Sequence, residues 1–106
     1  MSQYQICLCT CPDEELAQSL ARSLIEAKLA ACVNILPAVQ SVYQWKGKIE
    51  KDRELLLLIK TAQHLFPAIE THILARHPYE LPEIIAVPIE AGFKPYLQWI
   101  DDVMES

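Results

Sequence analysis

Three segments of this chain are apolar at nearly every position: residues 6–9 (ICLC), 54–59 (ELLLLI) and 84–87 (IIAV). Side chains alternate between the two faces of a strand, so an antiparallel sheet with one face in water normally alternates apolar and polar residues. These segments therefore predict strands that are covered on both faces. Any fold the chain adopts must supply two layers of cover for one sheet.

The order of the predicted elements indicates the fold class. We expect strands at residues 4–11, 32–45, 49–61 and 83–90, and helices at residues 12–30, 62–76 and 94–106. Pro37 interrupts the second strand and is expected at a bulge or an edge position, and residues 46–48 form a hairpin turn. The order β-α-β-β-α-β with a terminal helix predicts an α+β fold of the ferredoxin-like type, an antiparallel four-stranded sheet with two helices on one face.

Two helices on one face leave the other face of this sheet uncovered. The 106 residues suffice for one domain, residues 1–106, and offer no spare element for the second face. The apolar fraction of 52% is also high for a soluble domain. We therefore predict that the sheets of identical chains pack against one another.

The charge and the N-terminal sequence exclude several classes of protein. A net charge of −5 argues against a nucleic-acid binder, which normally carries a basic face. The N-terminal segment has no basic region followed by an apolar one, and the longest apolar run is too short to span a membrane. We expect a cytoplasmic protein without membrane or nucleic-acid partners, whose four cysteines are mostly reduced thiols.

A row of cysteines at alternate positions, Cys7, Cys9 and Cys11, is the first candidate for chemistry. Alternate strand residues share one face, so the three thiols lie on one side. A three-thiolate metal site is one interpretation. The favoured one is small buried hydrophobes, because zinc sites normally place a two-residue turn between cysteines. A single reactive or metal-binding thiol is more plausible at Cys9 or Cys11, near the N-terminus of the following helix.

His77 lies between the second predicted helix and Pro78, where the chain must leave the helical conformation. One interpretation is helix termination, with the imidazole bonding a carbonyl of the last turn, and the other is a ligand or catalytic group. A pair of Cys9 as nucleophile and His77 as base lacks an evident third, orienting group. The chain also has no phosphate-binding glycine loop and no H-E-x-x-H motif, so we expect no enzymatic activity.

Several motifs in combination resemble one known family. They are residues 28–35 (KLAACVNI), 45–50 (WKGKIE), 59–61 (IKT), 77–85 (HPYELPEII) and 96–100 (YLQWI). Over nearly its whole length the chain resembles the CutA family, the divalent-cation tolerance proteins. The resemblance implies a ferredoxin-like homotrimer in which hairpin strands pair across subunits. It also implies a role in tolerance to copper and other divalent metals.

The resemblance further implies a copper site. The residues implicated in the family are a Cys at the end of the first strand, matched here by Cys9, and a His-His pair before Pro-Tyr. His77 matches the second His of that pair, and Arg76 replaces the first. A fixed positive charge in place of a neutral imidazole weakens a metal site. Copper or another divalent cation is thus expected at Cys9 and His77, a pair that also suits Cu(I).

Polar residues in the same motifs are candidates for a cleft between subunits: Trp45, Glu50, Lys60, Tyr79, Glu80 and Glu83. The family resembles the PII signalling proteins in shape, which implies an alternative function as a signalling or adaptor trimer with a small molecule or partner in these clefts. Lys60 and Trp45 favour an anionic metabolite there. The same residues equally suit a role in fixing trimer geometry, and an indirect effect on metal tolerance is a further alternative.

Overall fold

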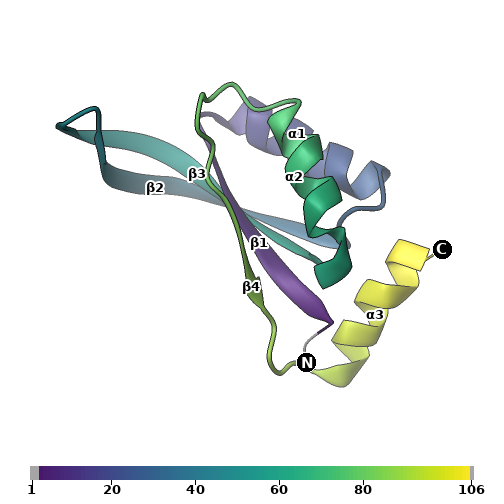
Figure 1. The fold of residues 1–106 in the computed structure, drawn as a ribbon. Coiled ribbons are helices and arrows are strands. Elements are labelled where there is room, and N and C mark those ends of the chain that lie inside the picture. The colour runs from purple at the N-terminus through teal and green to yellow at the C-terminus, as the bar shows by residue number, and fades with distance from the viewer. Residues whose placement is uncertain (1–2, 106) are drawn as a thin grey trace.

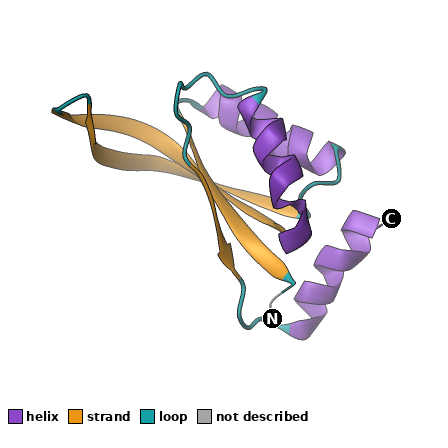
Figure 2. Cartoon of the chain, viewed as in Figure 1, coloured by secondary structure: helices purple, strands orange, loops and turns teal. Residues whose placement is uncertain are grey.

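The computed structural model describes residues 3–105 and confirms the predicted order of strands and helices (Figure 1). The elements are β1 (Tyr4–Cys11), α1 (Glu14–Glu26), β2 (Cys32–Trp45), β3 (Lys48–Ala62), the 3-10 turn η1 (Gln63–Leu65), α2 (Phe66–Leu74), β4 (Ile84–Pro88) and α3 (Lys94–Glu105). The strands form one antiparallel sheet in the order β2-β3-β1-β4 (Figure 2). The fold class α+β is therefore confirmed.

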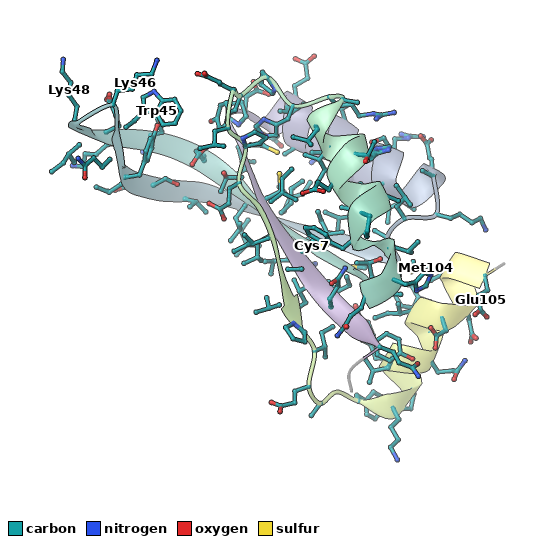
Figure 3. The ribbon with its side chains drawn as sticks, in the orientation of Figure 1. Cys7, Trp45, Lys46, Lys48, Met104 and Glu105 are labelled. Carbon is teal, nitrogen blue, oxygen red and sulfur yellow. The ribbon has the colours of Figure 1, made fainter. Side chains whose placement is uncertain are left out.

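The long hairpin of β2 and β3 projects beyond the helices (Figure 1). Lys46 and Gly47 both have positive φ, 51° and 80°, as a two-residue type I′ turn requires. Figure 3 shows Trp45, Lys46 and Lys48 at its far end. The register shifts between Leu36 and Val39, so Pro37 lies at a bulge on an edge strand, as predicted.

Helix α1 is shorter than predicted because a left-handed residue stops it. Asp13 caps its N-terminus, where its carboxylate accepts the N–H of Leu16 at 2.8 Å, and the helix ends at Glu26 instead of residue 30. Lys28 has φ 58°, and the N–H of Leu29 bonds the carbonyl of Leu24 at 3.0 Å. This bond is part of a Schellman motif, in which Lys28 takes the position that glycine usually occupies. A lysine at this position does not indicate a helix end in the sequence.

Two other boundaries differ from expectation. The helix predicted at residues 62–76 is the turn η1 followed by α2, with Pro67 in its first turn, where its missing N–H is harmless. β4 spans Ile84–Pro88 instead of residues 83–90. Pro82 precedes β4 and Pro88 is its last residue, and neither has an N–H to donate to a strand ladder.

The odd-numbered residues of β1 and β3 face α1 and α2, which lie on one face of the sheet (Figure 1). Cys9 pairs with Leu57 and Cys7 with Ile59, and all four are 0% exposed. Large apolar side chains of both helices complete this core: Leu20, Leu24, Ile69 and Ile73. The cysteines of β1 are thus core residues on the helix side.

The second face of the sheet is partly covered by α3, which corrects the expectation that the chain has no element for it. The hydroxyl of Tyr4 donates to the carboxylate of Asp101 at 2.6 Å, and Ile100 is 0% exposed. Further along this face, Ile85 and Val87 remain 54% and 50% exposed. An apolar surface is therefore left open. No helix within residues 3–105 is long and apolar enough to cross a membrane.

Candidate functional site

The loop between α2 and β4 closes the edge of the sheet beside the end of β1. β4 pairs with β1 only as far as Cys9, so Thr10 lies beyond the last residue paired on that side. The side chain of His77 takes the place of the missing strand: its Nε2 lies 2.8 Å from the carbonyl oxygen of Thr10, and the residue is 9% exposed. His77 thus bonds a strand carbonyl, and the predicted bond to its own helix is wrong.

Two hydrogen bonds define the protonation of the His77 ring. The backbone N–H of Tyr79 can only donate, and it lies 3.2 Å from Nδ1. Nδ1 therefore carries the lone pair, while Nε2 carries the proton that it donates to Thr10. Both ring nitrogens of His77 thus have protein partners.

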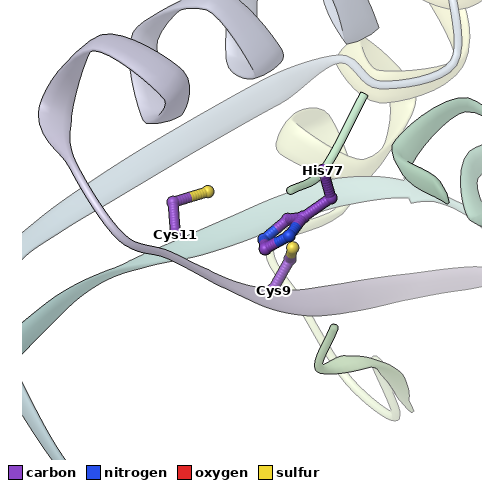
Figure 4. A group of neighbouring side chains, drawn as sticks. All are labelled: Cys9, Cys11 and His77. Carbon is purple, nitrogen blue, oxygen red and sulfur yellow. The ribbon is translucent and has the colours of Figure 1, made fainter. Parts of the chain in front are cut away.

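Two thiols lie next to this ring (Figure 4). The ligand atoms of Cys9, Cys11 and His77 are all within 4.8 Å of one another, and all three residues are buried. The structure brings together the two residues predicted for a metal, Cys9 and His77. It adds Cys11, which the sequence favoured only as an alternative to Cys9, and it leaves Cys7 outside the group.

The thiols of Cys9 and Cys11 shift each other's pKa. The hydrogen bond with Cys11, followed by burial, holds the pKa of Cys9 far above its usual value. The same hydrogen bond lowers the pKa of Cys11, so the first thiolate of the pair forms there. Burial raises the pKa of Cys7 to about 11. A protonated Cys9 beside a His77 whose lone pair is already engaged is poorly suited to act as a nucleophile.

The donor set matches the chemistry of soft metals. Thiolate sulfur and imidazole nitrogen suit copper and zinc, whereas magnesium and calcium prefer oxygen. In the described part of the chain, no carboxylate belongs to this group. Binding a metal there requires loss of thiol protons and release of at least one ring hydrogen bond of His77. The residues thus fit a thiophilic cation.

A groove of about 650 Å³ lies on the opposite face of the sheet, between the hairpin and the loop after His77. Four residues predicted for a cleft line it: Trp45, Tyr79, Glu80 and Glu83. Glu50 and Lys60 do not. The Nζ of Lys60 instead donates to the side chain of Asn34, within the same chain.

The groove is acidic and aromatic. The hydroxyl of Tyr79 donates to Glu54 at 2.7 Å, and the hydroxyl of Tyr43 donates to Asp52. Glu54 is only 5% exposed, so it is a buried carboxylate. Burial, and then the bond to Glu54, raises the pKa of Tyr79. None of the described lining residues is Lys, Arg or His.

Trp45 lies at the far end of this groove and is half-buried. The ammonium of Lys46 lies 5.7 Å from the centre of its ring, a cation–π contact.

Comparison with known proteins gives concordant matches. The family described as CutA1 divalent ion tolerance protein matches residues 5–103. Protein CutA of Homo sapiens is 52% identical over 92% of this chain, which spans only 54% of that relative. The divalent-cation tolerance protein CutA of Thermus thermophilus is 48% identical over 91% of this chain and 93% of its own length.

A solved structure agrees with the sequence matches. The crystal structure of CutA1 from the psychrotrophic bacterium Shewanella sp. SIB1 superposes with a TM-score of 0.94 at 48% identity. The superposition covers 99% of this chain and 98% of that one. The chain spans about half the length of the mammalian relatives it matches, and nearly the whole length of the bacterial ones.

Proposed function

Because this chain belongs to the CutA1 divalent ion tolerance protein family, we propose that it is a metal-binding protein that contributes to tolerance of divalent metal ions, copper first among them. One observation carries the proposal. Cys9 on β1 and His77 in the loop after α2 are far apart in sequence, yet a thiol sulfur and a ring nitrogen lie within 4.8 Å in a buried site. Both are ligands of copper.

Isothermal titration with copper tests this function. We expect the wild-type protein to bind copper and the double variant Cys9→Ser, His77→Ala to lose that binding. Cys32→Ser and His64→Ala form the matched control, since they remove one free thiol and one exposed histidine outside the site. Copper binding that is unchanged in the double variant removes this site from consideration.

We further propose that the chain forms a homotrimer of ferredoxin-like subunits. The strand order β2-β3-β1-β4 with two helices on one face supports the subunit fold. The apolar residues left open on the second face, such as Ile85 and Val87, support self-association. Sedimentation equilibrium is expected to give three chains per particle, and a monomer mass across the micromolar range contradicts the proposal.

The groove motivates a second candidate function, that of a PII-like signalling or adaptor protein with a ligand or partner in this cleft. Its size suits a small molecule. The groove does not suit the anionic metabolite that Lys60 suggested, because carboxylates line it. Lys60 lies outside the groove, and none of the described lining residues is basic. A thermal-shift screen of nucleotides, organic acids and amines tests this function, and no shift at millimolar concentration counts against it.

We propose a binding role without catalysis, in the cytoplasm. The free thiols Cys7, Cys9, Cys11 and Cys32 suit a reducing compartment. Fractionation of cells that express the full-length protein tests its location. Recovery in an oxidising compartment contradicts the cytoplasmic assignment.

A further inference from the structure

Cys11 is placed to bind the same ion as Cys9. Both point to the helix side of β1, because alternate strand residues share a face. Both are 0% exposed, and their sulfur atoms lie within 4.8 Å of each other and of a ring nitrogen of His77. Metal–sulfur bonds of about 2.3 Å and metal–nitrogen bonds of about 2.0 Å let two ligands of one ion lie up to roughly 4.6 Å apart. The three donor atoms are therefore close to bonding separation for one ion.

Arg76, the residue before His77, offers this site no electron-pair donor. Its guanidinium Nη1 donates to the carbonyl of His72 at 2.9 Å, so the side chain lies along its own helix end and is exposed. The next donor available near Cys9 and His77 is the sulfur of Cys11.

We infer that Cys11 is the third protein ligand of this site, and that two sulfurs with one imidazole make the site selective for monovalent copper over divalent cations. The inference rests on the proposed metal-binding function of Cys9 and His77. Soft thiolates favour Cu(I) and zinc, but structural zinc is almost always bound by four ligands, which three donors do not supply. The group holds three donors and, within residues 3–105, no carboxylate. The burial of all three also keeps water from supplying the missing ligand of a divalent ion.

Competition with a Cu(I) chelator under anaerobic conditions tests the inference on the full chain. The wild-type protein is expected to take one Cu(I) per chain and to bind it more tightly than Zn²⁺ or Mn²⁺. The Cys11→Ala variant should lose at least the roughly 10–100-fold in affinity that loss of an outer-shell partner costs at metal sites. Cys7→Ala is the matched control, because Cys7 is an equally buried thiol on the same face of β1 and lies outside the group.

X-ray absorption of the copper-loaded protein supplies a readout independent of affinity. We expect two sulfur neighbours and one nitrogen neighbour in the wild type, and one sulfur neighbour in Cys11→Ala. Circular dichroism establishes that each variant is folded, and Cys11→Ser repeats the test if the alanine variant is not.

The outcomes separate this inference from the proposed function. If Cys9→Ala loses copper while Cys11→Ala keeps wild-type affinity, the role of Cys11 is overturned and the proposed function stands. Zinc binding as tight as that of Cu(I) overturns the selectivity. If no cysteine or His77 substitution changes copper binding, the proposed function and the inference both fail.

Discussion

The imidazole Nε2 of His77 donates to the carbonyl oxygen of Thr10 at 2.8 Å, across 67 residues of sequence, at the point where β4 no longer pairs with β1. The bond satisfies the buried carbonyl of Thr10, which β4 does not reach and which also accepts a weak hydrogen bond from the thiol of Cys9 at 3.7 Å. It also fixes the ring beside the thiols of Cys9 and Cys11. One contact therefore serves both the fold and the candidate metal site.

Loss of this ring should destabilise the protein. His77→Ala leaves the Thr10 carbonyl with only the weak thiol donor of Cys9 at 3.7 Å, and a poorly satisfied buried polar group costs about 1–3 kcal/mol. Urea unfolding of the metal-free protein measures the change. His64→Ala, at an exposed histidine, is the control and should change the free energy of unfolding little. Equal stability of the two variants contradicts a structural role for His77.

Removal of one hydroxyl in the groove should have a similar effect. Tyr79→Phe removes the donor to Glu54, whose carboxylate is 5% exposed, and we expect a loss of about 1–3 kcal/mol. Tyr43→Phe removes the analogous bond to Asp52 from a tyrosine that is 41% exposed. Surface substitutions usually change stability by no more than about 0.5 kcal/mol. A larger effect at Tyr43 than at Tyr79 contradicts this ranking.

The ending of α1 offers a stabilising substitution. Lys28 has φ 58°, a conformation that costs a side-chain-bearing residue roughly 1–2 kcal/mol and costs glycine nothing comparable. Lys28→Gly should therefore raise the melting temperature. Glu26→Gly, two residues earlier and still helical, should lower it. The two glycine variants are thus expected to shift the melting temperature in opposite directions. A lower melting temperature for Lys28→Gly would contradict strain at Lys28.

The hydrogen bond to Asp52 raises the pKa of Tyr43 to about 12. Because the folded-state pKa is raised, the folded protein keeps this proton after the unfolded chain has lost it. The stabilisation is thus complete below the ordinary value of 10.0 and is lost as the pH rises toward about 12. NMR titration of labelled tyrosines should show Tyr43 ionising late, and Asp52→Asn should bring its pKa down. An unchanged titration in that variant means that Asp52 is not the cause.

The sequence was sufficient to predict the features that depend on neighbouring residues. Alternation placed Cys7, Cys9 and Cys11 on one face, and Pro37 marked a bulge on an edge strand, because both effects act within one strand. The end of α1 was missed because the left-handed conformation falls on Lys28, a residue type that does not signal it.

The grouping of site residues depended on tertiary contacts that no local pattern reveals. Cys11 joins Cys9, and Cys7 does not, because the loop that carries His77 crosses the end of β1. Lys60 lies on the same face of β3 as Glu54, which lines the groove. Six residues of strand place the two about 20 Å apart, so Lys60 is too far along the strand to reach the groove. Their places in the family motifs suggested one cleft for the six polar residues, whereas Glu50 and Lys60 do not line the groove.

The most direct test of the metal site is a crystal of the protein loaded anaerobically with Cu(I), with diffraction measured on both sides of the copper absorption edge. We expect one anomalous peak per chain at bonding distance from the sulfurs of Cys9 and Cys11 and from a ring nitrogen of His77. Copper found only at the surface, with the His77 ring still bonded to Thr10 and Tyr79, would contradict the site proposed for this chain.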